Sequence, residues 1–238
     1  MKIALIGFGK MGVAVERMAK LRGHEIGLVI GSSGIDSSNL KELKQCDVAI
    51  EFTAPNAVVS NLLRCFEEGV PVVTGTTGWN DKIDFISEIC IQKNAAVFHS
   101  SNFSFGVNVM FRLNEVLAEM MKKVPGYEVT LEEQHHIHKK DAPSGTAITL
   151  ADGILRHSLS KTKYSIHDFS QPDELSIRVV REDEIPGTHI VRYTSSVDQI
   201  QLSHQAFNRD GFALGAVLAA EFLVGKIGVF TMKHLLGF

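Results

Sequence analysis

The residues that decide the fold are Met1–Gly12, which read MKIALIGFGKMG. The apolar run Lys2–Ile6 predicts a buried β-strand, and an amphipathic pattern beyond the third glycine predicts a helix as far as Leu21. Glycine at positions 7, 9 and 12 permits a tight turn and a close approach of the helix to the strand. The chain is therefore expected to open with the strand–turn–helix unit of an α/β domain.

The spacing of these glycines, GxGxxG, is typical of a turn that binds the pyrophosphate of a dinucleotide. The second glycine lets the phosphates approach the backbone, and the N-terminus of the following helix faces them. A glycine-rich turn without a ligand is the alternative interpretation. We expect the turn to bind a dinucleotide through Gly7, Phe8, Gly9, Lys10, Met11 and Gly12.

Strand-like and helix-like segments alternate strictly as far as residue 103. Short apolar runs bounded by polar residues predict strands, and longer amphipathic runs between them predict crossover helices. Further strands are expected at Glu25–Ile30, Asp47–Thr53, Val70–Thr74 and Ala95–His99, and further helices at Pro55–Glu68 and Lys82–Lys93. This order predicts a Rossmann-type parallel sheet with helices on both faces.

Two more loops follow strand ends, where open α/β sheets bind ligands. Their glycines and small hydroxyl residues leave room for a cofactor, and the ring of Phe103 is expected to cover a nicotinamide face. Ordinary turn chemistry is the alternative. The residues assigned to the cofactor in these loops are Gly75, Thr76, Thr77, Ser100, Ser101, Asn102 and Phe103.

The loop after the second strand bears on which dinucleotide is used. A site that prefers NAD usually has an acidic residue there, about 20 residues beyond the glycines. Here no acid occurs between the strand and Asp36, and Ser32 and Ser33 offer hydroxyl donors to a 2′-phosphate, although no Arg stands nearby. We expect use of both NADH and NADPH, with NADPH somewhat favoured.

After residue 103 the pattern changes to that of an α+β domain. Strands are expected at Tyr127–Gln134, Ser176–Arg181, Thr188–Thr194 and Gln199–Ala206, and helices at Gly106–Lys123, from Ser144 onward and at Phe212–Val224. Because turns such as Pro186-Gly187 join consecutive strands, the second sheet is expected to be mostly antiparallel. Spacing alone leaves open which domain the last helix packs against.

The composition narrows the class of protein. At 238 residues the chain is long enough for one large or two modest domains. Its net charge of −3 argues against a nucleic-acid-binding protein. The three cysteines fit neither a zinc site nor a redox pair, and the apolar N-terminal run is too short to span a membrane. We expect a cytoplasmic protein with reduced cysteines and no nucleic-acid or membrane partner.

The stretch His135–Thr146, HHIHKKDAPSGT, is the most informative for chemistry. Five of its first six residues are histidine or lysine, which makes a local cationic patch. The following Pro143-Ser144-Gly145-Thr146 predicts a helix N-terminus, whose free backbone N–H groups favour anions. Histidine adds a proton donor that titrates near neutral pH. The stretch predicts a site that binds a carboxylate or phosphate and supplies a proton, as a reductase of an unsaturated anion requires.

Two other interpretations of this stretch stay open. His135, His136 and His138 could be metal ligands, but the flanking lysines would repel a cation and no cysteine or carboxylate follows at ligand spacing. The charges could also be a surface run without function, which the helix start makes less attractive. We expect no metal.

The string HHIHKKDAPSGTA resembles the signature of the dihydrodipicolinate reductases, HHxxKxDAPSGTA. The similarity extends over nearly the whole chain through IGFGKMG, DVAIEFT, VTGTTG, SNFSFGVNV and HQAFNRDGFALGAVLAAEFL. It implies NAD(P)H-dependent reduction of 4-hydroxy-tetrahydrodipicolinate, a small dicarboxylate, or its dehydrated form, to tetrahydrodipicolinate in the diaminopimelate and lysine pathway. It also implies a homotetramer, with a dinucleotide-binding domain over 1–103 completed by 208–238, and a substrate-binding and tetramerisation domain over 104–207.

The same resemblance assigns roles by position. It implies that His135 is the acid/base and Lys139 the proton-relay or substrate-clamping cation. The residues implied to hold the substrate carboxylates are His136, Ser144, Gly145 and Thr146. Two departures concern cofactor choice and loop geometry or assembly: the acidic ribose ligand is missing, and Arg178–Asp183 replaces the family's Arg-Gly-Gly turn.

Two other functions are weighed beside this one. A related amino-acid dehydrogenase would share the glycine turn but has no need of the HHxxKxDAPSGT string. A non-catalytic redox sensor would bind the dinucleotide without turnover, and the cationic loop would then be idle.

Overall fold

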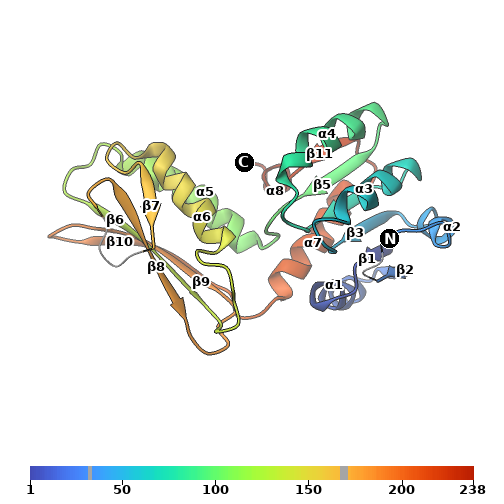
Figure 1. Ribbon diagram of the computed structural model, residues 1–238, viewed down its shortest axis with the longest axis horizontal. Coiled ribbons are helices and arrows are strands. Elements are labelled where there is room, and N and C mark those ends of the chain that lie inside the picture. The colour runs from blue at the N-terminus through green and yellow to red at the C-terminus, as the bar shows by residue number, and fades with distance from the viewer. Residues whose placement is uncertain (32–33, 167–170) are drawn as a thin grey trace. The chain divides into compact units, whose positions relative to one another are not determined.

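The computed structural model describes residues 1–31, 34–166 and 171–238. The chain forms two compact units, one made of Met1–Phe105 with Arg209–Phe238 and the other of Gly106–Asn208 (Figure 1). These bounds differ by one or two residues from the expected 1–103 with 208–238 and 104–207. Within the described ranges, no helix is both long and apolar enough to cross a membrane.

The first unit is built on a six-stranded sheet in the order β11-β5-β4-β3-β1-β2. All neighbouring strands in it are parallel, which confirms the expected Rossmann-type sheet. The strands are β1 (Lys2–Ile6), β2 (Glu25–Ile30), β3 (Val48–Glu51), β4 (Val72–Thr74), β5 (Ala96–His99) and β11 (Gly228–Phe230). The helices are α1 (Lys10–Leu21), α2 (Leu40–Leu43), α3 (Val58–Glu67), the 3-10 helix η1 (Asn80–Lys82), α4 (Ile83–Gln92), α7 (Asp210–Leu223) and α8 (Met232–Leu236).

Helices cover both faces of this sheet because its strands are apolar on both sides. In β1, Ile3 and Leu5 lie in one buried cluster with residues of α7, whereas Ala4 and Ile6 lie in another with residues of α3. Successive strand residues point to opposite faces, so one fully apolar strand supplies both clusters. The sheet is therefore the centre of the core and holds the loops at its carboxyl edge in place.

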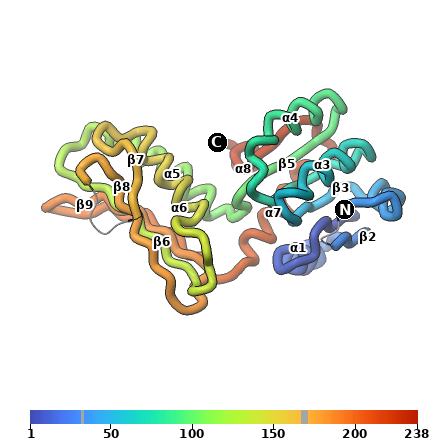
Figure 2. The backbone as a smooth tube through the Cα atoms, in the orientation of Figure 1, coloured from blue at the N-terminus to red at the C-terminus, as the bar shows by residue number. Residues whose placement is uncertain are grey.

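The last helix and the tail belong to the first unit. Helix α7 packs against α1 and against β3, β4 and β5 (Figure 2). Strand β11 extends the sheet by pairing with β5. At Gly215 the helix approaches the loop after β5 so closely that a Cβ atom would lie 1.9 Å from the carbonyl oxygen of Phe103. Glycine is required there, and the contact fixes the base of that loop.

The second unit contains a five-stranded sheet in the order β10-β9-β6-β8-β7. Its strands are β6 (Glu128–His135), β7 (Lys163–Ser165), β8 (Glu174–Arg181), β9 (Thr188–Thr194) and β10 (Gln199–Gln205). Two helices, α5 (Phe105–Met121) and α6 (Gly145–His157), supply residues of the same buried cluster as one face of the sheet. The single cluster makes this unit a second core with its own scaffold.

The expectation of a mostly antiparallel second sheet is wrong in one respect. The pairs β10–β9 and β9–β6 are antiparallel, but β6–β8 and β8–β7 are parallel, so the sheet is mixed. The turn at Pro186-Gly187 joins β8 to β9, yet β6 lies between these two strands. The chain passes from β6 through α6 before it returns to β8, and such a crossover yields parallel neighbours.

Candidate functional site

The glycine turn after β1 has the geometry expected of a pyrophosphate cradle. Gly7 has φ +91°, and a Cβ atom there would lie 2.0 Å from the carbonyl oxygen of Phe52. A Cβ atom at Gly12 would lie 2.4 Å from the carbonyl oxygen of Gly7, so helix and turn touch directly. Around Gly9, by contrast, nothing lies within 4 Å of such an atom. The turn is closely packed on its inner side and open at the residue expected to approach the phosphates.

The N-terminus of α1 is also suited to an anion. Gly9 is the N-cap residue, no side chain of the described residues caps the helix, and its first turn has no acidic residue. The first N–H groups of a helix have no partner within it and carry a partial positive charge. Lys10 adds a cationic, exposed side chain at the first helical position. The residues present therefore fit a dinucleotide pyrophosphate.

The other residues assigned to the cofactor lie at the same edge of the sheet but differ in exposure. Gly75, Thr76 and Thr77 follow β4, and 100–103 follow β5. Thr77 and Ser101 are exposed, whereas Thr76 is buried and its hydroxyl donates to Glu51 Oε1 at 3.0 Å. Ser100 Oγ donates to the carbonyl oxygen of Asn102 at 2.7 Å, which shapes the turn. Ser32 lies outside the described residues.

The expected role of the Phe103 ring is wrong. This side chain is 2% exposed and packs between Phe52 and Phe98, with ring centroids 5.9 and 5.8 Å away. An aromatic ring next to a strand end can pack in the core or against a ligand, and the Phe103 ring packs in the core. Only the backbone of Phe103 is left to face a cofactor.

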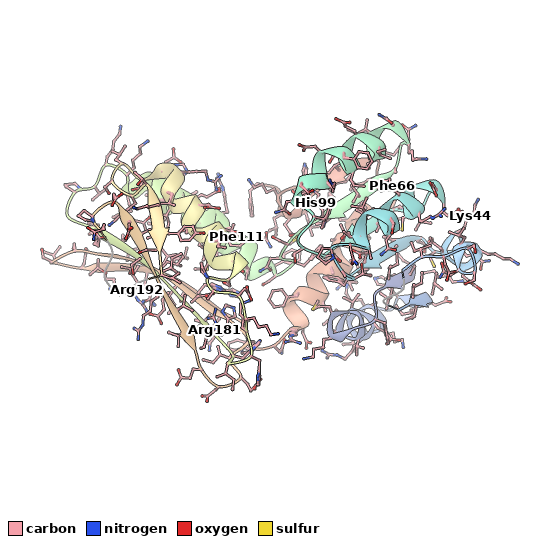
Figure 3. The ribbon with its side chains drawn as sticks, in the orientation of Figure 1. Lys44, Phe66, His99, Phe111, Arg181 and Arg192 are labelled. Atoms are coloured by element: carbon pink, nitrogen blue, oxygen red, sulfur yellow. The ribbon has the colours of Figure 1, made fainter. Side chains whose placement is uncertain are left out.

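The cationic stretch of the second unit is organised around a buried carboxylate, that of Glu133. Its side chain is 0% exposed and lies on β6, two residues before His135 and on the same face of the strand. Arg181, labelled in Figure 3, lies at the end of β8. Its Nη2 atom donates to Glu133 Oε1 at 2.8 Å. The backbone N–H of Ser144 donates to both carboxylate oxygens at 3.1 Å. One carboxylate thus connects β6, β8 and the N-terminus of α6.

His135 lies beside this carboxylate. Its Nδ1 atom is 3.2 Å from Glu133 Oε2, without the alignment of a hydrogen bond. Its Nε2 atom faces Gly187, where a Cβ atom would lie 3.0 Å away. A side chain at Gly187 would press on this ring, so the glycine backbone packs closely beside the nitrogen. The arrangement presents the ring as a proton donor or acceptor that is positioned by a carboxylate, as acid–base catalysis requires.

Burial of Glu133 alone would raise its pKa, yet its contacts with His135, Ser144 and Arg181 lower that pKa to about 2. The carboxylate is therefore ionised at neutral pH. His189 is the second histidine of the group, and Ser144 Oγ lies 3.1 Å from its Nε2 atom. Burial and the neighbouring His135 lower the pKa of His189 to about 3, so this ring is neutral at pH 7.

The remaining residues of the stretch surround the start of α6. Ser144 is the N-cap of α6, and its Oγ accepts from Ala147 N at 3.2 Å. Its N–H and hydroxyl both form hydrogen bonds within the protein. Gly145 and Thr146 follow it in the first turn of α6, where backbone N–H groups favour an anion. Lys139 Nζ is bound by both oxygens of Asp141 at 2.8 Å.

The three histidines of the stretch differ in exposure and in their neighbours, although the rings of His136 and His138 lie 6.1 Å apart. His138 is exposed and its Nε2 atom pairs with Glu184 at 3.2 Å, whereas His135 is buried. Among the described residues, the group with ligand atoms within 4.8 Å of one another is Glu133, His135 and His189. The carboxylate of Glu133 already forms an ion pair with Arg181 at 2.8 Å. We therefore interpret the group as a hydrogen-bonded network and not as a metal site.

Sequence reasoning missed Glu133 as part of the site. Its signal is its place on a strand: with a side-chain period of two, it shares a face with His135 and with the buried Val129 and Leu131. A charged residue on such a face has to be paired. Arg181 is the second of two arginines in the segment Arg178–Asp183, which departs from the Arg-Gly-Gly pattern. The positive φ of 45° at Asp183 shows that the turn keeps a left-handed residue without glycine.

The low pKa of His189 predicts a pH dependence of stability. The unfolded chain binds a proton at this residue below pH about 6.5, whereas the folded chain binds it only below about 3. The free energy of unfolding should therefore fall as pH falls through this window. In His189→Gln the slope should be smaller by up to about 1.4 kcal/mol per pH unit. Urea unfolding at several pH values measures it, and an unchanged slope would refute the assignment.

Comparison with known families covers the chain from end to end. Residues 1–103 match the family described as dihydrodipicolinate reductase, N-terminus, and residues 106–236 match dihydrodipicolinate reductase, C-terminus. The chain is 48% identical over 236 residues to a 4-hydroxy-tetrahydrodipicolinate reductase of Christiangramia forsetii, covering 99% of this chain and 98% of the relative. It is 35% identical over 247 residues to the Staphylococcus aureus protein of the same name, covering 99% and 100%.

Solved structures agree on the fold. A dipicolinate-bound dihydrodipicolinate reductase from Paenisporosarcina sp. TG-14 superposes with a TM-score of 0.78 at 19% identity, covering 97% of each chain. An engineered D-amino acid dehydrogenase bound to NADP+ superposes with a TM-score of 0.57 at 13% identity, covering 99% of this chain and 95% of the other. At these identities the likeness concerns the two-unit fold.

Proposed function

Because this chain belongs to the dihydrodipicolinate reductase family, we propose that it reduces 4-hydroxy-tetrahydrodipicolinate, or its dehydrated form, to tetrahydrodipicolinate with NADH or NADPH. The observation that carries the proposal is the grouping of His135, Glu133 and Arg181 beside the N-terminus of α6. This group combines an acid–base residue with cations and helix N–H groups, which suit a dicarboxylate.

In the first unit, the turn from Gly7 to Gly12 binds the pyrophosphate through the open backbone at Gly9 and the N-terminus of α1. The exposed residues of the loops after β4 and β5, such as Thr77 and Ser101, line the rest of the dinucleotide. When bound, the dinucleotide supplies the hydride. Because Ile30 is followed by no acidic residue before Asp36, nothing there repels a 2′-phosphate.

In the second unit, His135 holds the proton that completes the addition, with Glu133 positioning its ring. The amides of Gly145 and Thr146 bind one substrate carboxylate. His136, whose Nδ1 atom is buried without a hydrogen-bond partner among the described residues, binds another. Lys139 exchanges Asp141 for the substrate and relays the proton.

The test is oxidation of NADH and of NADPH, followed at 340 nm, with substrate generated in place from pyruvate and aspartate semialdehyde. We expect turnover with both, and a kcat/KM for NADPH higher than for NADH by less than about tenfold, since no Arg grips the extra phosphate. Dinucleotide binding without turnover would refute the reaction. Turnover of aspartate or another amino acid in its place would favour a dehydrogenase.

We further propose a cytoplasmic homotetramer. The family resemblance supports the assembly, and the three free, buried cysteines support a reducing compartment. Light scattering should give four times the chain mass of 26.1 kDa. A concentration-independent mass of one or two chains would contradict the tetramer, and recovery outside the cytosolic fraction would contradict the location.

A further inference from the structure

A carboxylate that the proposed reaction does not use is buried in the first unit. Glu51 is the last residue of β3, and its side chain is 0% exposed. Its Oε1 atom accepts from the backbone N–H of Thr53 at 3.1 Å, from Thr76 Oγ1 at 3.0 Å and from the Thr53 hydroxyl. Its Oε2 atom accepts from Thr74 Oγ1 at 2.6 Å. Burial of a carboxylate is costly, so a group kept in this way has its charge balanced by several donors.

These donors belong to loops at the carboxyl edge of the sheet. Thr53 lies in the loop after β3, and Thr76 in the loop after β4, where the exposed Thr77 follows. Thr74 also accepts, through its carbonyl oxygen, the N–H of Ser100 at 3.2 Å, at the start of the loop after β5. Glu51 therefore connects three of the loops that carry candidate cofactor residues.

Asn61 extends the network to the loop after β2. It is 1% exposed and lies on α3. Its Nδ2 atom donates to Thr53 Oγ1 at 3.4 Å, and its Oδ1 atom accepts the N–H of Ile35 at 3.1 Å. Ile35 follows the segment at the end of the second strand, which binds the adenosine ribose in dinucleotide-binding folds. The position of Ile35 thus depends on the same buried network.

The residue next to Glu51 is packed against the glycine turn. The carbonyl oxygen of Phe52 lies 2.0 Å from the place of a Cβ atom at Gly7. The Phe52 ring lies equally close to such an atom at Gly75, with Cε1 2.0 Å away. A shift of Phe52 would therefore disturb two of the glycines assigned to the cofactor. The hydrogen bonds of Glu51 within the buried network hold the backbone of the adjacent Phe52 in place.

We infer that Glu51 is a positioning residue for the dinucleotide, acting through the buried network of Thr53, Thr74, Thr76 and Asn61. The inference rests on the proposed function, because it takes the carboxyl edge of this sheet as the dinucleotide site. A fully bonded polar network in a low-dielectric interior is rigid. It holds the loops in their binding geometry before the ligand arrives, and a preordered site loses less entropy on binding.

Thr74→Val tests this with little change of shape. The side chain of Thr74 is buried, is not among the residues assigned to the cofactor, and valine removes only the donor to Glu51 Oε2. We expect the dissociation constants and KM values of NADH and NADPH to rise about tenfold, the usual effect of losing a hydrogen bond to a charged group. The value of kcat should stay within about twofold, since the reacting groups are untouched. Thr74→Ser restores the hydroxyl and should restore binding.

Ser87→Ala is the matched control, because it removes a hydroxyl that donates to Ile83 O at 2.7 Å within α4 of the same unit. It should leave dinucleotide binding unchanged. Should Thr74→Val fold poorly by circular dichroism, Asn61→Leu breaks the network at its other end and should weaken binding in the same way. Wild-type dissociation constants in a folded variant that has only a lower melting temperature would overturn the inference. Failure of the wild type to bind either dinucleotide would instead overturn the proposed function.

Discussion

His135→Ala is expected to lower kcat for the reduction by roughly a hundred- to ten-thousand-fold, the range for loss of a general acid. The reason is the position of the ring: it is buried, its Nδ1 atom lies 3.2 Å from Glu133, and its Nε2 atom lies beside the backbone of Gly187. Dinucleotide affinity should not change, because the glycine turn belongs to the other unit. Lys139→Ala should lower kcat by roughly a hundredfold and raise the KM of the substrate, since it loses both charge and relay.

His138→Ala is the control for this experiment. It lies in the same cationic stretch, but its side chain is 69% exposed and pairs with Glu184. Its removal should change kcat by less than about twofold, as expected for an exposed side chain that the proposed reaction does not use. Steady-state kinetics of the three variants decide the matter. If His135→Ala were as active as His138→Ala, His135 would not be the acid.

The fold of the first unit could be predicted because its determinants are local. The run Lys2–Ile6 and the glycines that follow it define strand, turn and helix without reference to the rest of the chain. Strand β11 has three residues and was missed, because so short a segment has no periodicity of its own. It exists because it pairs with β5, far away in the sequence. The expectation of a mostly antiparallel second sheet was wrong for the same reason, since no local signal places β6 between β8 and β9.

The residues of the candidate sites also fall into those with a local sequence signal and those without one. The glycine turn and the stretch from His135 to Thr146 could be found because their residues are adjacent in sequence. Glu51 and Glu133 escaped notice because a carboxylate near a strand end looks like any other acidic residue until its partners are known. Those partners, such as Arg181 for Glu133 and Thr74 for Glu51, come from other elements. Burial distinguishes such a carboxylate from a surface acid, and burial depends on the assembled sheet and cannot be seen in the local sequence.

Glu133→Gln should lower the free energy of unfolding by about 3 kcal/mol, the lower end of the range for breaking a buried ion pair, because Arg181 keeps 19% exposure. The amide keeps the shape of the carboxylate, but its NH2 group then meets a donor, either Arg181 or the N–H of Ser144. The variant should also lose about tenfold or more in kcat, because His135 loses the negative charge that orients it. Urea unfolding and steady-state kinetics measure the two effects.

Glu132→Gln separates the two consequences. Glu132 is the neighbouring residue on β6, points to the opposite face and is paired with Arg192 at 2.9 Å, so its loss should affect stability but not kcat. The pH dependence gives a further check. The folded pKa of Glu133 is about 2, against 4.5 when unfolded, so its stabilising contribution is complete above pH about 4.5 and disappears as pH falls towards 2. Wild type and Glu133→Gln should therefore differ most near neutral pH and converge in acid. A difference in unfolding free energy that stayed constant down to pH 2, or a Glu133→Gln variant with the kcat of Glu132→Gln, would show that this carboxylate does not hold the site together.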